Sequence, residues 1–252
     1  MTIKPAESKD IPALRHLWKE AFGDTDAFLD QFFRLAFSPD RCRMVLKNGA
    51  PVAALYWFDC SWESKKLAYL YAIATAKSHQ GQGLCRALME NTHDHLKSLG
   101  YRGAALVPAT KELFSLYEKF GYRPFCPMQS VCVEAAGTAA ELSPLSWKDY
   151  ETARRQYLPK DGILQEGATL RFLSTFARFY QGERFLLCGY EEEGKFQPCE
   201  FLGDPRELPH IAMALQEEEL KIHLPQGSTN TAMYLPLDET NKLPAYLGLN
   251  LN

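Results

Sequence analysis

The chain has 252 residues, of which 46% are hydrophobic and 23% are charged. These proportions are typical of folded globular proteins, so they exclude a disordered or fibrous chain, and the length predicts one large domain or two modest ones. The formal net charge is −3, and the sequence shows neither an export signal nor an apolar run of the roughly 20 residues that a membrane helix needs. We therefore expect neither a nucleic-acid partner nor a membrane partner.

The first half of the sequence predicts a mostly antiparallel sheet that is flanked by helices. The dipeptide Asn48-Gly49 is best suited to a type I′ turn, so it predicts a hairpin. Leu84, Leu88, Leu96 and Leu99 predict the face of one helix that meets the sheet. In chain order we expect a strand at 2–5, a helix at 11–22, a second helix between residues 25 and 39, strands at 43–47, 51–60 and 67–75, a helix after residue 83, a strand at 104–107, a helix at 111–120 and a strand at 128–134.

Residues 135–140 are small and show no strong periodicity, so we place a domain boundary there and predict domains at 1–135 and 136–252. The second half repeats, more weakly, the order helix, helix, hairpin, helix, strand of the first half, which indicates a tandem duplication. Its expected elements are helices at 147–157 and 168–179, a hairpin of 185–189 and 196–202, a helix at 206–215, strands at 220–223 and 232–236, and a tail strand from residue 246.

The segment Gln80-Gly81-Gln82-Gly83 carries the clearest chemical signal, because it lies where a predicted strand gives way to a helix. Glycines relieve the backbone there, and the free amide N–H groups of a helix N-terminus bind a phosphate or pyrophosphate. A Rossmann fingerprint would need glycine where Arg86 stands, and a Walker loop would need a Gly-Lys-Ser/Thr sequence that does not occur. An ordinary tight turn without a ligand is the remaining alternative.

Two motifs at a matching distance resemble those of the GNAT superfamily of acyl-CoA N-acyltransferases. Residues 80–85, Gln-Gly-Gln-Gly-Leu-Cys, are similar to its Gln/Arg-x-x-Gly-x-Gly/Ala signature, with Cys85 in place of the small last residue. Residues 116–122, Leu-Tyr-Glu-Lys-Phe-Gly-Tyr, resemble its Leu-Tyr-Glu-Lys-x-Gly-Phe/Tyr motif. The resemblance implies an α/β (α+β) GNAT-like fold, with a mixed, mostly antiparallel sheet flanked by helices, followed by a second, degenerate GNAT-like α/β domain.

The resemblance also implies which residues bind the cofactor, acetyl-CoA. Its pyrophosphate would rest on the amides of Gly81 to Arg86, and its pantetheine arm would lie along the strand that ends at Thr75. A backbone amide of that strand would stabilise the oxyanion, and Tyr117 is the candidate general acid for the departing thiolate. The implied cofactor-binding residues are Ile73, Ala74, Thr75, Gln80, Gly81, Gln82, Gly83, Leu84, Cys85 and Arg86.

The run from Gly83 to Met89 is similar to the enhanced-intracellular-survival type of acetyltransferase, which has tandem GNAT-like domains and a third, sterol-carrier-like domain that we do not expect here. In that type the terminal carboxylate acts as a base, so the resemblance makes Asn252 a second candidate catalytic residue. The second half lacks a phosphate cradle, because Asp204 and Pro205 stand where its helix begins and favour capping. We therefore expect one coenzyme A per chain.

Taken with the resemblance, these features predict an N-acetyltransferase that moves an acetyl group from acetyl-CoA to a primary amine of a small molecule or peptide. The alternative is a non-catalytic acyl-CoA-binding or regulatory module. Seven scattered cysteines without a Cys-x-x-Cys pair, and six histidines without ligand spacing, predict reduced thiols, a cytoplasmic location and no metal. The sequence leaves the acceptor and self-association into a homo-oligomer open.

Overall fold

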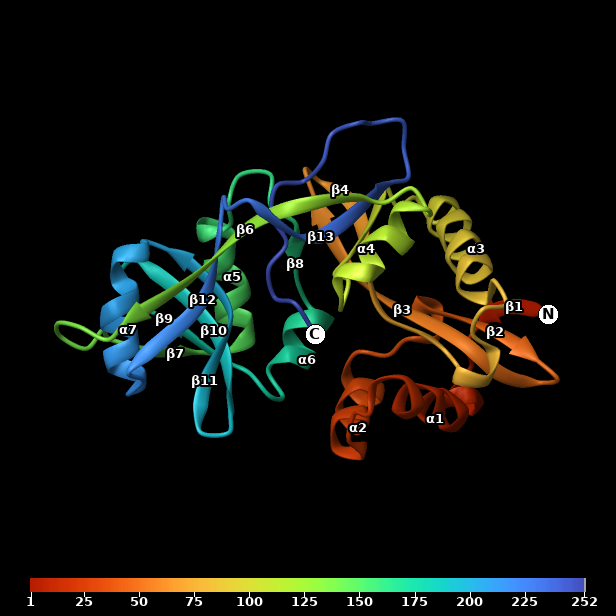
Figure 1. Ribbon diagram of the computed structural model, residues 1–252, viewed down its shortest axis with the longest axis horizontal. Coiled ribbons are helices and arrows are strands. Elements are labelled where there is room, and N and C mark those ends of the chain that lie inside the picture. The colour runs from red at the N-terminus through yellow and green to blue at the C-terminus, as the bar shows by residue number, and fades with distance from the viewer. Residues whose placement is uncertain (252) are drawn as a thin grey trace. The chain divides into compact units, whose positions relative to one another are not determined.

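The computed structural model describes residues 1–251, which form two compact units (Figure 1). Unit 1 consists of Met1–Arg123 and Met233–Lys242, and unit 2 consists of Pro124–Ala232 and the residues from Leu243 on. The predicted domains divide the chain between residues 135 and 136. The compact units have other bounds, because the chain leaves unit 1 earlier and a later segment returns to complete it.

Unit 1 contains a mixed sheet and helices whose ends follow local sequence signals. Its elements are β1 (Thr2–Pro5), α1 (Ile11–Phe22), α2 (Asp26–Leu35), β2 (Cys42–Lys47), β3 (Ala50–Trp62), β4 (Lys65–Thr75), α3 (Leu84–Ser98), β5 (Gly103–Leu106) and α4 (Lys111–Glu118). Thr25 caps α2, because its side chain accepts a hydrogen bond from the Phe28 amide. Asn48 and Gly49 both have positive φ, so the predicted hairpin turn is confirmed.

The sheet of unit 1 is antiparallel from β1 to β4 and is completed by a strand from far along the sequence. β5 runs parallel to β4. The other edge of β5 pairs antiparallel with Met233–Pro236, the second half of β13 (Thr229–Pro236). Gly103 is required at this contact, because a Cβ atom there would lie 2.1 Å from the Tyr234 hydroxyl oxygen. Met233–Pro236, which comes late in the sequence, is therefore a strand of the unit 1 sheet.

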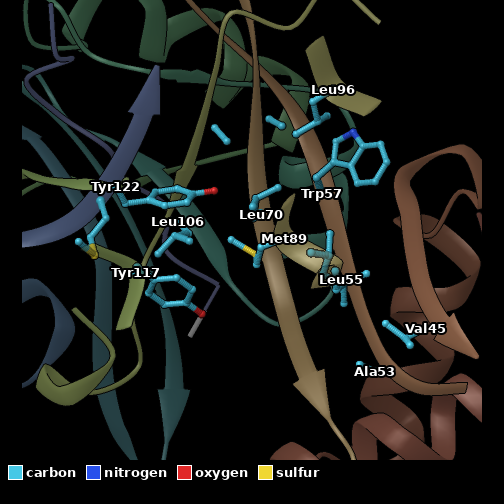
Figure 2. Packing of buried hydrophobic residues seen from close by; sticks show 14 of the residues in the cluster. Val45, Ala53, Leu55, Trp57, Leu70, Met89, Leu96, Leu106, Tyr117 and Tyr122 are labelled. Carbon is cyan, nitrogen blue, oxygen red and sulfur yellow. The ribbon is translucent and has the colours of Figure 1, made fainter. Parts of the chain in front are cut away.

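Helices cover both faces of this sheet, with α1 and α2 on one side and α3 and α4 on the other (Figure 1). Because side chains alternate along a strand, Trp57 of β3 packs in the cluster that α3 and α4 cover, whereas Tyr56 contacts α1 and α2. On the second face the Trp18 ring lies 4.6 Å from Phe32 and 5.1 Å from Tyr56, measured between ring centroids. Figure 2 shows the first cluster, in which Val45, Leu55, Trp57, Leu70, Met89, Leu96, Leu106, Tyr117 and Tyr122 are buried together.

Within the described residues, unit 2 contains a second sheet and three α-helices. Its elements are β6 (Arg123–Glu134), β7 (Ser143–Leu145), α5 (Trp147–Tyr157), β8 (Leu164–Gln165), α6 (Ala168–Leu173), β9 (Arg178–Gln181), β10 (Phe185–Glu192), β11 (Lys195–Gly203), α7 (Leu208–Leu215) and β12 (Glu219–Pro225). The second sheet is four-stranded and antiparallel in the order β11, β10, β9, β7, while β6 pairs antiparallel with β12. A mixed sheet and a second antiparallel sheet, both with helices, confirm the predicted fold class.

Two predictions for helices are wrong in detail. The helix expected over 168–179 ends at Leu173, and β9 follows it. Phe172 and Phe179 are spaced as on one helix face, but Phe179 is buried by pairing with Cys188 of β10, so strand pairing overrides the helical pattern. Leu99, expected to face the sheet, is the C-cap residue of α3 and is 48% exposed, because the helix ends before it could turn inward.

The tail of the chain is buried, but it does not form the strand that the sequence predicts. Tyr246 makes an isolated parallel bridge with Gly162, and no regular strand follows it within the described residues. Leu247 is held instead by Cys126, whose Sγ accepts a hydrogen bond from the Leu247 amide at 3.3 Å. The tail therefore bonds to side chains as well as to backbone.

A buried ion pair in unit 2 contacts the tail. Arg154 of α5 donates two hydrogen bonds to Glu200 of β11, at 2.8 and 2.9 Å, and the two residues are 0% and 3% exposed. The hydroxyls of Tyr150 and Tyr246 donate to the same carboxylate, each at 2.9 Å. Gly248 allows the tail to come this close, because a Cβ atom there would lie 1.8 Å from Glu200 Oε1.

Candidate active site

The predicted phosphate cradle lies between β4 and α3. Gly81 and Gly83 have φ of 71° and 73°, and Gly83 is the N-cap residue of α3. A Cβ atom at either glycine would meet nothing within 4 Å, so the left-handed backbone, and not crowding, favours glycine here. No side chain of the described residues caps this helix start, so its first amide N–H groups are free to bind an anion.

The side chains of Gln80 and Gln82 form hydrogen bonds that connect the cradle to β4 and β2. Gln80 Nε2 donates to the Thr75 carbonyl at 3.3 Å, which ties the turn back to the end of β4. Gln82 Oε1 accepts a hydrogen bond from Lys47 Nζ at 2.5 Å. The second contact brings an ammonium group of β2 to the turn, which the sequence did not reveal because residues 47 and 82 are far apart in the chain.

Arg86 lies on the exposed surface of the first turn of α3. Its guanidinium is 4.9 Å from the centroid of the Phe120 ring, and one of its nitrogens is 3.6 Å from a Glu90 carboxylate oxygen. Exposed ion pairs of this kind contribute at most about 1 kcal/mol. The contact with Glu90 therefore opposes a movement of the Arg86 guanidinium to a phosphate at the helix start only weakly.

Leu84 and Cys85 can offer only their backbone amides to an anion. Leu84 is 4% exposed, and its side chain packs in the cluster of Figure 2. Cys85 is half-buried against the same cluster, and this burial raises the pKa of its thiol. At neutral pH the thiol is therefore protonated, which is the less nucleophilic form of cysteine.

The end of β4 is bulged next to the cradle. Ala54 pairs with Ala74, but Tyr56 pairs with Tyr71, so β4 has one more residue than β3 over this interval. Ala72 lies in the bulge with a φ of 48°, a conformation that is rare for alanine. Strained backbone of this kind is common at functional sites, and nothing in an alanine marks it in the sequence.

β4 also diverges from its parallel neighbour at this point. Tyr69 and Ala105 form the last β4–β5 pair of the described strands. Ile73, Ala74 and Thr75 of β4 lie beyond it, and Ile73 and Thr75 are partly exposed. A strand edge without its neighbour offers backbone donors and acceptors to an extended ligand.

Tyr117 lies on α4 and is 7% exposed (Figure 2). Its ring centroid is 6.2 Å from that of Phe120 and 5.9 Å from that of Tyr122. Burial, followed by the neighbouring Cys85 thiol, raises the pKa of its phenol. The hydroxyl therefore keeps its proton at neutral pH.

Two residues of the sequence analysis remain, Asn252 and Asp204. Asn252 falls outside the described residues, so its predicted role stays a prediction. Asp204 caps the short helical turn before α7, where its side chain accepts a hydrogen bond from the Arg206 amide at 3.0 Å. The capping prediction is confirmed. The Arg206 hydrogen bond lowers the pKa of Asp204 to about 2, so a negative charge occupies this helix start at neutral pH.

Other classes of site are not evident in the part of the chain that the structure describes. It contains no group of three or more His, Cys, Asp or Glu side chains arranged to hold a metal ion. Among the same residues, no helix has the length and apolar composition needed to cross a membrane.

A family model described as an acetyltransferase (GNAT) domain matches residues 2–125. This range holds the cradle, the bulged end of β4 and Tyr117. No curated protein matches the sequence.

Solved structures of low sequence identity share the fold over nearly the whole chain. A GCN5-related N-acetyltransferase from Anabaena variabilis has a TM-score of 0.75 at 12% identity, covering 94% of this chain and 73% of its own. A probable N-acyltransferase from Enterococcus faecalis has a TM-score of 0.71 at 12% identity, covering 94% and 72%. Eis1 from Mycobacterium abscessus has a TM-score of 0.70 at 10% identity, covering 94% and 74%. At these identities the likeness shows the fold, and it extends over both units.

Proposed function

The chain belongs through residues 2–125 to the GNAT acetyltransferase family, and on this premise we propose that it transfers an acetyl group from acetyl-CoA to a primary amine of a small molecule or peptide. The observation that carries the proposal is the glycine turn, whose uncapped helix start adjoins the bulged and diverging end of β4. A phosphate site and a strand edge are thus adjacent along the chain.

Each part of the cofactor has a matching surface in the proposal. The pyrophosphate accepts hydrogen bonds from the backbone amides of Gly81 to Arg86, where the positive end of the α3 dipole favours an anion. The pantetheine arm lies along Ile73 to Thr75 and exchanges backbone hydrogen bonds with the free edge of β4. Leu84 contributes its amide only, since its side chain is buried.

The chemistry needs an oxyanion donor and a proton donor. When the amine attacks the thioester carbonyl, a backbone amide near the Ala72 bulge donates to the oxyanion. The departing thiolate takes a proton from Tyr117, whose phenol is protonated at neutral pH. A primary amine is mostly protonated at this pH, so a base must first deprotonate it, and the terminal carboxylate of Asn252 is our proposal for that base.

The second half is proposed as a degenerate copy that binds no cofactor. Asp204 supports this, because its carboxylate occupies the helix start that would otherwise attract a pyrophosphate. A cytoplasmic location is part of the same proposal, since the seven cysteines all lie within the described residues and are free thiols.

Calorimetric titration with acetyl-CoA tests the cofactor site. Gly83→Asp places a carboxylate where the pyrophosphate should bind, so we expect affinity to fall by at least tenfold, a loss of about 1.4 kcal/mol. Gly100→Asp is the matched control: Gly100 has a φ of 79°, its Cβ position is equally open, and it follows the other end of the same helix. Equal affinity of the two folded variants would refute the site.

Release of coenzyme A thiol during incubation with acetyl-CoA and a panel of amines tests the activity. A transferase releases thiol only when its acceptor is present. Binding without release for every class of amine would favour the alternative, a non-catalytic acyl-CoA-binding or regulatory module.

A further inference from the structure

A β-bulge in unit 2 brings two cysteines together. Cys188 of β10 pairs with Glu200 of β11, but the next residue, Gly189, pairs with Pro198. Cys199 is therefore the extra residue of the bulge and shares with Glu200 the position opposite Cys188. The bulge therefore places the two cysteines at facing positions of neighbouring strands, although they are separated along the hairpin.

The spacing of paired strands suits a disulfide between these two residues. Residues opposite one another on antiparallel strands have Cα atoms roughly 4.5–5.5 Å apart, and disulfides join Cα atoms roughly 4.4–6.8 Å apart. Both cysteines are free in the structure. A bond between them would require side-chain rotation at an already irregular point of the hairpin.

Only one of the two thiols is accessible. Cys188 is fully buried, whereas Cys199 is half-buried and lines a cavity of about 240 Å³ together with Glu200 and Tyr246. A cavity of that volume admits a small oxidant. Cys199 would therefore react with the oxidant first. The buried Cys188 would then react with the oxidised sulfur of Cys199.

We propose that Cys188 and Cys199 form a reversible disulfide when the protein meets a peroxide, and that the disulfide loosens the tail of the chain. The Cys199 sulfur attacks one peroxide oxygen, the O–O bond breaks, and a sulfenic acid and one alcohol or water molecule form. The Cys188 sulfur then attacks the sulfenic sulfur, and the departing hydroxide takes the Cys188 proton and leaves as water. Two thiols lose two electrons in total, and the peroxide gains them.

The effect on the tail follows from Glu200. It is the chain neighbour of Cys199 and the pairing partner of Cys188, so a covalent bond between the cysteines shifts its backbone. Its carboxylate accepts a hydrogen bond from the Tyr246 hydroxyl. The backbone of Gly248 packs directly against the same carboxylate, with no room for a Cβ atom between them. Displacement of this carboxylate breaks a buried contact on which the tail depends. Disulfides of cytoplasmic proteins are characteristically transient and redox-sensing, which agrees with such a role.

Peptide mapping of the full-length protein tests the disulfide directly. Trypsin cuts after Arg184, Lys195 and Arg206, so the two cysteines fall in the separate peptides 185–195 and 196–206, with one cysteine each. After hydrogen peroxide treatment and blocking of remaining thiols, we expect these peptides to be cross-linked, and dithiothreitol to separate them. Cross-links to other cysteines, or irreversible oxidation of Cys199 with Cys188 still reduced, would overturn the proposal.

Two variants, a control variant and one further measurement complete the test. Cys199→Ser and Cys188→Ala should each abolish the cross-link, while Cys132→Ser, which removes an exposed cysteine, should leave it unchanged. Hydrogen exchange of the Leu247 amide should accelerate at least tenfold in the oxidised protein and return to its original rate after reduction. Unchanged exchange in cross-linked protein would overturn the proposed effect on the tail. These readouts do not involve coenzyme A, so they are independent of the proposed function.

Discussion

Removing the buried negative charge of Glu200 should destabilise unit 2 severely. Glu200→Gln keeps the shape of the side chain but leaves the Arg154 cation uncompensated at 0% exposure. It also places an amide NH₂ group against donors that now bond to the carboxylate. Breaking a buried ion pair from one side costs about 3–5 kcal/mol, which is a large share of the roughly 5–15 kcal/mol by which domains are stable.

Urea unfolding followed by circular dichroism measures this loss. The control is Glu191→Gln, which removes the same charge from an exposed position in β10 and should change the free energy of unfolding by no more than about 0.5 kcal/mol. In the double variant Arg154→Met, Glu200→Met, no buried cation remains, so it should be no less stable than Glu200→Gln alone. If Glu200→Gln unfolds at the same urea concentration as Glu191→Gln, the ion pair does not hold the unit together.

Three further outcomes are expected. Tyr117→Phe should keep its affinity for acetyl-CoA while turnover falls by roughly 10² to 10⁴, as for loss of one general acid, and unchanged turnover with chemistry rate-limiting would reduce Tyr117 to a packing residue. Deleting the last three residues should lower turnover more than acetyl-CoA affinity, with one coenzyme A bound per chain; a fully active truncated enzyme or two equivalent sites would contradict our view of the second half. Burial lowers the pKa of His93 from 6.5 to about 4. Between these two pH values the unfolded chain binds more protons than the folded protein does. The free energy of unfolding should therefore decrease by about 3 kcal/mol as the pH falls from above 6.5 to about 4. Urea unfolding at several pH values should show this dependence weakened in His93→Gln and kept in His16→Gln.

Local signals made much of unit 1 predictable from the sequence. Asn48-Gly49 fixed the hairpin because few other dipeptides adopt its turn, and the glycines of residues 80–83 marked the start of α3 because only glycine adopts positive φ without strain. The roles of Tyr117 and Asn252 stay predictions. The bulge at Ala72 carries no local signal, because alanine does not favour its conformation.

Contacts between distant parts of the sequence were not predictable in this way. The pairing of Arg154 with Glu200 depends on the packing of α5 against β11, and a single sequence does not reveal which buried arginine meets which glutamate. The insertion of Met233–Pro236 beside β5 was missed for the same reason. The strand at the end of the second half was expected, but its partner in the first half was not.

That late strand has a consequence for how the protein is made. While the ribosome synthesises the chain, β5 emerges well before Met233–Pro236, and at about 5–20 residues per second the delay is on the order of ten seconds. During this time one edge of the first sheet is unpaired, which exposes it to aggregation or to chaperones. A fragment that ends at residue 123 or 135 would keep that edge unpaired permanently. The first unit should therefore be expressed only as part of the whole chain, and a nonsense mutation before residue 233 should remove both units at once.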